Sequence, residues 1–371
     1  MVIPDQRWCR HRSGDAELDM VWYLHPLSWN FQCWGRITIA TIGAVAAYAG
    51  VGVGTVSRVL NNNSQVSPAT RARVQSAIDD LGYAPRRASS RRPDPSTGFI
   101  GVLVPFFDQP SSSLRVSGIV SGLQSHDLHV VLYSVDDSDR ARRRLRDLPR
   151  QPLDGLIVIS VPLRGDEGKR LAAARFPTVL IDTRHELLPS VVIDDRAGGR
   201  TATEHLLSLG HRRIGFVGEP LRNPFGFESS PNRELGYQDA LREFDIELRQ
   251  KYIRHGAHLR SSGQQLGSEL LRLADRPTAI FASSDVQALG VLAAAQNLGI
   301  EPGKDLSVIG YDDIDIAVHS GLSTIRQGLQ RSGERGAEIM AGALASGNRP
   351  DPFIEELPLE LVVRSTTTSP R

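Results

Sequence analysis

Residues 41–61 constrain this chain more than any other stretch. Their sequence is TIGAVAAYAGVGVGTVSRVLN. Thr41 is suited to cap a helix that runs through Tyr48, and Gly50 is suited to the turn that ends it. A second helix is expected over residues 53–60, carrying small polar side chains and Arg58. Two short helices joined by a tight turn are typical of a helix-turn-helix, whose second helix enters the major groove of DNA.

A third helix is predicted shortly afterwards. Ser67 followed by Pro68 is a strong helix start, because serine caps the helix and proline suits its first turn. Apolar residues then recur at helical spacing, at Val74, Ala77, Ile78 and Leu81. Residues 37–85 are therefore expected to form an all-helical DNA-binding domain.

The positive charge of the chain is concentrated in one segment. Its net charge is only +1 over 371 residues, which excludes a protein that is basic over its whole surface. Between residues 39 and 97, however, seven arginines stand against three aspartates. Any affinity for nucleic acid is therefore expected to come from this segment.

Two segments flank the helical domain and differ from it. All four tryptophans and both cysteines, Cys9 and Cys33, lie within residues 1–36. This extension is expected to be disordered or to come from a start site assigned too far upstream. Alternatively, it is an added interaction segment. Residues 86–97 (RRASSRRPDPST) are basic and contain proline, and we assign them as a hinge linker.

The cysteines have neither a disulfide framework nor metal-ligand spacing. The chain also has no apolar run of about 18 residues, the length expected of a membrane helix. We therefore expect a protein of the reducing cytoplasm that has no membrane segment.

From residue 98 to residue 371, short apolar runs alternate with amphipathic helical segments. Strands are expected at 99–104, 130–133, 155–161, 178–181, 213–217, 279–282 and 306–309, and helices at 111–124, 195–209, 233–244, 264–275 and 285–298. Such alternation is typical of an α/β fold in which helices cover both faces of a parallel sheet. The units are too many for one small sheet. We predict two lobes, with a ligand cleft at the carboxyl ends of the strands.

The segments TIATIGAVAAYAGVGVGTVSRVLN and VSPATRARVQSAIDDLGYAPRRA resemble the DNA-binding head of the LacI/GalR family of bacterial repressors. Downstream, IGVLVPFF, DGLIVIS, NRELGYQDAL, PTAIFASSDVQALG and DLSVIGYDDID are similar to the periplasmic-binding-protein-like core of that family. The resemblance runs from about residue 37 to residue 371. It implies operator DNA as the partner, a homodimer, since one head contacts only a half-site, and a small-molecule effector.

The resemblance places particular residues of the second helix on DNA. Val53, Gly54 and Arg58 match positions that face base edges. Arg58 is the strongest candidate, because its planar fork can bond O6 and N7 of guanine together. The expected phosphate contacts, which set register rather than sequence, are Thr55, Ser57, Asn61, Arg71 and Arg73.

The linker departs from the family pattern. In relatives a leucine of a hinge helix wedges into the minor groove at the operator centre. Here that position is Arg92, followed by Pro93. Arg92 either enters a narrow minor groove in place of the leucine or belongs to a solvated flexible linker.

In the core, the resemblance assigns Arg233, Ser284, Asp285 and Asp312 to ligand binding. An arginine and an aspartate that face each other across a cleft suit a sugar, whose hydroxyl groups donate to the carboxylate and accept from the guanidinium. Asp285 is alternatively only a helix-capping residue.

The loop after the first strand adds Phe106 and Asp108 at the mouth of the cleft. The Phe106 ring is expected either to stack on ligand or to pack at the hinge. Phe225 and Phe227, in a loop rich in glycine and proline, either form a lid over the cleft or pack on the surface.

These patterns predict a DNA-binding transcriptional repressor controlled by a carbohydrate effector. The alternative is a solute-binding protein of the transport type, which predicts a signal peptide and no DNA-binding head. An enzyme on the same core is the third possibility. The chain shows no nucleophile motif, no metal-ligand spacing and no nucleotide-binding loop, so we expect no catalytic residues, no metal and no cofactor.

Overall fold

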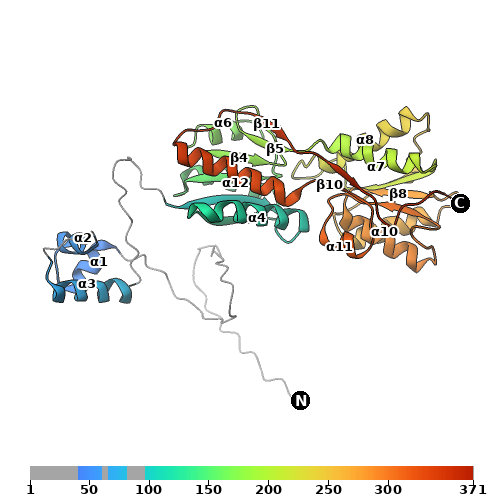
Figure 1. The fold of residues 1–371 in the computed structure, drawn as a ribbon. Coiled ribbons are helices and arrows are strands. Elements are labelled where there is room, and N and C mark those ends of the chain that lie inside the picture. Colours follow the sequence, from blue (N-terminus) through green and yellow to red (C-terminus); the bar gives the residue numbers. More distant parts are fainter. Residues whose placement is uncertain (1–40, 61–65, 82–96, 371) are drawn as a thin grey trace, which may run out of the picture. The chain divides into compact units, whose positions relative to one another are not determined.

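The computed structural model describes residues 41–60, 66–81 and 97–370 (Figure 1). The chain divides into two units, Met1–Pro95 and Ser96–Arg371, which are described separately. Residues 1–36, most of the linker, Asn61 and Arg92 lie outside the described residues.

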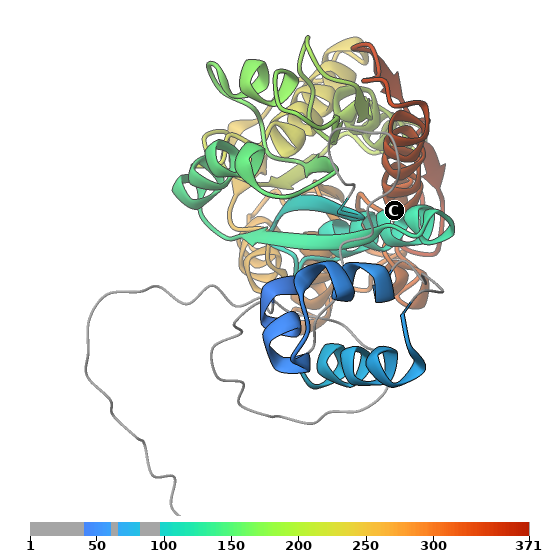
Figure 2. The same ribbon diagram turned by 90° about the vertical axis from the view of Figure 1, so that its left-hand side faces the viewer.

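The first unit contains three helices, α1 (Ile42–Ala49), α2 (Val53–Leu60) and α3 (Pro68–Asp80), drawn in blue in Figures 1 and 2. Thr41 caps α1 by accepting a hydrogen bond from the amide of Ala44 at 3.2 Å. Gly50 ends α1 in the left-handed conformation, with φ of 61°. Ser67 caps α3 through the amide of Thr70 at 3.3 Å. The sequence signals for the helix starts and for the turn are thus confirmed.

These helices share one small apolar core. Its members are Val45, Ala46 and Ala49 of α1, Val56 and Val59 of α2, and Val74, Ala77 and Ile78 of α3. Among the described residues, no single helix is long and apolar enough to cross a membrane. Helices α1 and α2 meet that test of length and composition only as a pair, which is bent by 104°.

The second unit has two lobes, each built on a parallel sheet. In the six-stranded lobe the strand order is β11 (Ile354–Glu356), β5 (Ser190–Val192), β4 (Thr178–Ile181), β3 (Gly155–Ile159), β1 (Phe99–Pro105) and β2 (His129–Val135). Helices α4 (Pro110–Leu123) and α12 (Leu329–Ser346) cover one face, and α5 (Ser138–Asp147) and α6 (Glu167–Ala172) cover the other (Figure 1).

In the four-stranded lobe the order is β7 (Ile253–His255), β6 (Ile214–Gly218), β8 (Ala279–Ala282) and β9 (Ser307–Ile309). Helices α7 (Asp195–Ser208) and α8 (Ser229–Glu243) cover one face. Helices α9 (Arg260–Leu271) and α10 (Asp285–Asn297) cover the other, together with the short α11 (Asp315–His319). In the described part of the chain, single-turn 3-10 helices lie at Gln124–His126 and Leu148–Arg150 of the six-stranded lobe and at Gln250–Tyr252 of this one. The prediction of two α/β lobes is confirmed.

Burial on both faces explains the continuous apolar runs of the central strands. In β1, Ile100, Val102 and Val104 join the cluster under α4 and α12, whereas Leu103 joins the cluster under α5 and α6. Successive side chains point to opposite faces of a strand, so a strand buried on both faces needs apolar residues at almost every position.

The chain passes between the lobes at three points: after β5, after β10 (Thr324–Arg326), and between β11 and β12 (Glu360–Val362). Strands β10 and β12 pair antiparallel, and the segment that carries β11 and β12 runs along both lobes in Figure 1. Leu357 packs against the apolar clusters of both lobes. We refer to these three crossings as the hinge.

Reciprocal glycines allow the paired helices to approach closely. A Cβ on Gly118 of α4 would collide with the backbone of α12 at Gln330, and one on Gly333 of α12 would collide with the backbone of α4 at Arg115. The same arrangement joins α7 to α8 and α9 to α10, through Gly199 with Gly236 and Gly263 with Gly290. Backbone contact therefore sets the helix spacing in both lobes.

Replacing Gly333 by alanine should lower the free energy of unfolding of the second unit by about 1–3 kcal/mol, because the added methyl group overpacks the contact with α4. The control is Gly342→Ala in the same helix, where a Cβ meets no atom within 4 Å. This control should raise stability by about 0.5–1 kcal/mol, since alanine is the better helix former. Urea unfolding measures both, and equal shifts would show that backbone contact does not set the spacing.

Candidate functional site

The first candidate site is the exposed face of α2. Val56 and Val59 point into the core, whereas Val53, Gly54 and Arg58 are exposed and Thr55 and Ser57 are partly exposed. Val53 is an apolar residue with 48% of its surface exposed, which the core of the unit does not explain. A Cβ on Gly54 would meet no atom within 4 Å. The start of α2 therefore presents an exposed surface with little side-chain bulk, which the edge of a base can approach.

The two arginines predicted on α3 have different settings. Arg71 donates from Nη1 to the carbonyl oxygen of Val59 at 3.4 Å, so it ties α3 to the last turn of α2. Arg73 is exposed. Of the two, Arg71 has a structural contact within the unit.

The second candidate site is a cavity of about 600 Å³ between the lobes of the second unit. It is lined mainly by residues that follow the carboxyl ends of strands, as expected for parallel sheets. The six-stranded lobe contributes Phe106 and Asp108 after β1, Ser160 after β3 and Asp182 after β4, together with Arg115 from α4. The four-stranded lobe contributes Glu219, His258 and Asp312 after β6, β7 and β9, together with Arg233 from α8.

Backbone strain is concentrated around this cavity. Four of its lining residues other than glycine have positive φ: Phe106 (44°), Ser160 (54°), Asp182 (58°) and Asp312 (120°). Such conformations are unfavourable for residues with a Cβ and persist where the surrounding structure holds them, often at functional sites. The strain independently marks the cavity as the functional region of the second unit.

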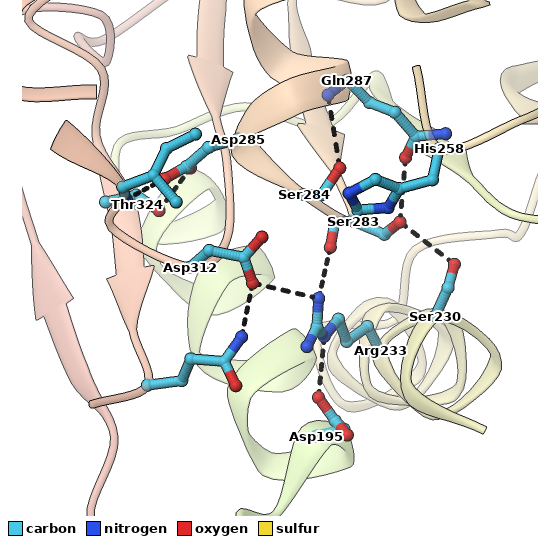
Figure 3. Close-up of polar contacts among 12 residues, drawn as sticks. Asp195, Ser230, Arg233, His258, Ser283, Ser284, Asp285, Gln287, Asp312 and Thr324 are labelled. Carbon is cyan, nitrogen blue, oxygen red and sulfur yellow. Dashed lines mark hydrogen bonds and ion pairs between the residues drawn. The ribbon is translucent and has the colours of Figure 1, made fainter. Parts of the chain in front are cut away.

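Arg233 is the centre of the polar lining (Figure 3). It is only 6% exposed, and its Nε lies 2.7 Å from Oδ1 of Asp195. Its Nη1 donates to the carbonyl oxygen of Ser283 at 2.6 Å and lies 3.6 Å from Asp312. The guanidinium also lies 3.6 Å from the ring centre of Tyr311. Burial lowers the pKa of Arg233, but Asp195, Tyr311 and Asp312 outweigh it and raise the pKa, so the group stays charged.

The carboxyl group of Asp312 is held between two partners. Nε2 of Gln327 donates to its Oδ1, and Nη1 of Arg233 lies 3.6 Å from the same oxygen. Burial raises the pKa of Asp312, and the charges of Arg233, His258 and Arg115 only partly oppose this effect. Loss of any of these cations would favour the neutral acid.

Arg115 was not predicted, although it is the second arginine of the cavity. Its Nη2 lies 3.0 Å from Oδ1 of Asp182 and donates to Oε1 of Gln327 at 2.9 Å. The side chain is buried, and its Nε has no hydrogen-bond partner among the described residues. A buried donor of this kind is costly unless a ligand or solvent satisfies it.

Glu219 and His258 form a further pair in the lining, with Oε1 and Nδ1 3.0 Å apart. Burial lowers the pKa of His258, but the hydrogen bond and charge of Glu219 outweigh burial and raise it. Burial raises the pKa of Glu219, and His258 outweighs that effect and lowers it. Each partner therefore stabilises the charged form of the other.

Two predicted ligand contacts, Ser284 and Asp285, do not line the cavity. Ser284 caps α10 by accepting from the amide of Gln287 at 3.2 Å. Asp285 accepts from the hydroxyl of Thr324 at 2.6 Å and from the amide of Ile314 at 3.0 Å (Figure 3). These contacts hold the start of α10, hinge strand β10 and the segment before α11 together, and the assignment of Ser284 and Asp285 to ligand binding stays a prediction.

The structure brings the other four predicted ligand-binding residues together, because the cavity is lined by Phe106, Asp108, Arg233 and Asp312. Asp182 and Glu219 were missed. Asp182 directly follows the strand predicted at 178–181, and Glu219 lies two residues after the strand predicted at 213–217, so both lie where ligands bind parallel sheets. Arg115 and Gln327 have no such signal. Within the described residues, no group of three or more His, Cys, Asp or Glu is arranged to hold a metal.

Replacing His258 by glutamine should destabilise the second unit more at pH 6 than at pH 8. The raised pKa of His258 means that its pairing with Glu219 stabilises the fold fully below the ordinary histidine pKa and is lost as pH rises through the folded value. Urea unfolding at both pH values measures the difference. His319→Gln, on the exposed side of α11, is the control for replacing a histidine outside the cavity. An equal loss for His258→Gln at both pH values would contradict the ion pair.

Two family models match the chain. The model of bacterial regulatory proteins of the lacI family matches residues 41–86. The model of a periplasmic binding protein-like domain matches residues 203–367. The first range contains α1–α3. The second contains most of the four-stranded lobe together with α12 and two of the three hinge crossings, those after β10 and between β11 and β12.

The similarity to individual proteins spans both units. The chain is 32% identical over 337 residues to the HTH-type transcriptional regulator CelR of Thermobifida fusca, covering 88% of this chain and 98% of CelR. It is 29% identical to catabolite control protein A of Priestia megaterium, over 88% of this chain and 99% of that protein.

Two solved structures show the same similarity. The lac repressor dimer bound to operator and the anti-inducer ONPF has a TM-score of 0.70 and 30% identity, covering 89% of this chain and 100% of the repressor chain. The CelR–cellobiose complex has a TM-score of 0.65 and 30% identity, covering 88% of this chain and 100% of that one.

Proposed function

This chain belongs to the lacI family of bacterial DNA-binding regulators, and we propose that it is a repressor whose operator affinity is set by a neutral sugar bound between its lobes. The first unit supplies the DNA-binding head and the second supplies the sensor. The relatives are DNA-binding regulators rather than enzymes, and the match of the lacI model to residues 41–86 disfavours a solute-binding protein of the transport type.

The observation that carries the sugar proposal is the alternation of buried donors and acceptors around the cavity. Arg115 and Arg233 offer N–H groups, and Asp182 and Asp312 offer carboxylate oxygens. Each of these two arginines already has a carboxylate partner, so neither offers an unpaired cation to a phosphate or carboxylate ligand. A sugar hydroxyl both donates and accepts, and it suits such a mixed lining. The related CelR structure holds cellobiose.

The proposed regulation of operator affinity follows from the lobes to which these groups belong. Asp182 and Arg115 belong to one lobe, and Arg233 and Asp312 belong to the other, so a bound sugar bridges the lobes across the hinge. A ligand that favours one arrangement of the lobes changes operator affinity by its differential binding to that arrangement. The regulator acts as a homodimer, since one head contacts only a half-site. We place it in the cytoplasm, with its DNA.

For the head, we propose that Val53, Gly54 and Arg58 contact base edges. Thr55, Ser57 and Arg73 contact phosphates, as does Asn61, which lies outside the described residues. The linker residue Arg92, also outside them, enters a narrow minor groove in place of the leucine of relatives. The exposure of Val53 and Arg58 beside the buried Val56 and Val59 supports this division. Arg71 contributes mainly by holding α2 against α3.

Replacing Arg58 by alanine should cost about 1–3 kcal/mol of operator binding and much less on random DNA, because a bidentate contact to guanine is lost. The control Arg73→Ala should weaken binding to both DNAs alike, as expected for a phosphate contact. Fluorescence anisotropy at fixed salt measures both affinities, after the operator has been selected from random-sequence DNA. An equal loss on both DNAs for Arg58→Ala would refute base contact.

Asp312→Asn should remove the thermal stabilisation that sugars give while keeping operator binding, because the amide retains the shape of the carboxyl but not its charge. A screen of neutral mono- and disaccharides by thermal shift identifies the ligand, since a ligand at about 100 times its Kd stabilises by about 2.7 kcal/mol. Asp315→Asn, on the exposed side of α11, is the matched control. If the sugar raised the unfolding temperature of Asp312→Asn as much as that of the wild-type protein, it would have to bind at another site.

A further inference from the structure

Three phenylalanines from the two lobes meet at the cavity. Phe225 and Phe227 belong to the loop between β6 and α8, and their rings are stacked with centres 4.9 Å apart and planes within 8°. Phe106, from the other lobe, has its ring centre 5.1 Å from that of Phe225 and 6.3 Å from that of Phe227. All three line the cavity. We call them the aromatic wall.

The loop that carries two of these rings is held in one conformation. Oδ1 of Asn223 accepts from the amides of Gly226 and Phe227 at 2.7 and 3.0 Å, and its Nδ2 donates to the carbonyl oxygen of Phe227 at 3.0 Å. Gly226 has φ of 81°, which a residue with a Cβ rarely adopts. The rings are therefore pre-positioned by short-range hydrogen bonds.

The loop is also attached to the opposite lobe. Nη2 of Arg164, which follows β3, donates to the carbonyl oxygens of Pro224 and Phe225 at 3.2 and 3.0 Å. A Cβ on Gly226 would lie 2.7 Å from this nitrogen, so a larger residue there would require the Arg164 side chain to shift. Phe225 is only 4% exposed and belongs to the apolar cluster of the six-stranded lobe.

The three rings therefore have different roles. Phe225 anchors the loop, because the neighbouring lobe buries it. Phe106 is 36% exposed and Phe227 is partly buried, and both keep surface toward the cavity. Phe106 also has positive φ, a strained conformation for an aromatic residue. Packing in the core alone does not explain an aromatic ring that is strained and partly exposed at a cavity.

The aromatic wall and the polar lining recognise different parts of a molecule. The hydroxyl groups of one sugar ring suit Arg115, Asp182, Arg233 and Asp312. Aromatic rings offer no such partners, but they pack well against a flat face of C–H groups or another ring. A cavity of about 600 Å³ is larger than a single six-membered ring needs and lies within the range of drug-sized ligands.

We propose that the aromatic wall is a second subsite, which binds a flat apolar ring face attached to the neutral sugar held by the polar lining. The effector is then a glycoside of at least two rings, and Phe106 and Phe227 set the preference for its second ring. The inference rests on the proposed function, because it needs a sugar in the polar lining. The second ring is either another sugar or an aryl group, and these share the same stacking chemistry.

The test compares ligands that share one sugar. Isothermal titration of the full-length protein uses the methyl glycoside, the disaccharide and the 4-nitrophenyl glycoside of each sugar that the thermal screen supports. At least one two-ring ligand should bind about tenfold or more tightly than its methyl counterpart, a ratio typical of one good stacking contact with its buried area. A preference for the disaccharide identifies a sugar as the second ring, and a preference for the nitrophenyl compound alone identifies an aryl group.

Phe227→Ala should reduce that ratio to about one while leaving binding of the methyl glycoside unchanged. Phe227→Leu should give an intermediate ratio, and it keeps the test informative where the alanine variant does not fold. Phe244→Ala is the matched control, since Phe244 is exposed and does not line the cavity. A wild-type ratio in both Phe227 variants overturns the subsite while the proposed function stands. If no neutral sugar of either size binds the wild-type protein, the proposed function fails and the subsite with it.

Discussion

A continuous chain of buried polar contacts crosses the hinge, and the geometry of the sensor depends on it. It runs from Asp195 through Arg233 and Asp312 to Gln327, and from there through Arg115 to Asp182. Burying ions is costly unless each has partners, and removing one partner of a buried pair costs about 3–5 kcal/mol. The lobes can therefore rearrange only in ways that keep these charges paired or hand them to a ligand.

The fold around these polar contacts could be predicted wherever burial leaves a pattern of apolar residues in the sequence. Strands buried on both faces need long apolar runs, so β1, β3 and β8 were evident. The strands β5, β7, β10, β11 and β12 were not predicted, because each has three residues, too few for any periodicity to show. β9 is equally short, but the apolar run at 306–309 predicted it. Helix α12 was missed for a different reason. Its glycines, including Gly333, weaken a helix signal, yet close packing against α4 requires glycine at that position.

The candidate site was predictable only in part, for a similar reason. Arg233 and Asp312 lie in segments that resemble a known family, and Phe106 follows an obvious strand. Arg115 looks like a surface arginine in a serine-rich helix, and its partners Asp182 and Gln327 are far along the chain. Only the folded structure brings them together. Conversely, Ser284 and Asp285 have suitable chemistry, but their oxygens are used by α10 and by β10.

The positions of the two linings decide how an effector can be coupled to DNA binding. An effector changes operator affinity only as far as it binds one arrangement of the lobes better than another, and a tenfold change needs about 1.4 kcal/mol of such difference. The polar lining is connected across the hinge by Gln327, which directly follows β10 and contacts both Asp312 and Arg115. The aromatic wall pairs Phe106 of one lobe with Phe227 of the other, outside that connected chain. The loop that carries Phe227 is itself held against the six-stranded lobe through Phe225 and Arg164. A ring stacked there therefore adds affinity, whereas the proposed sugar in the polar lining bridges the lobes and so couples binding to DNA affinity.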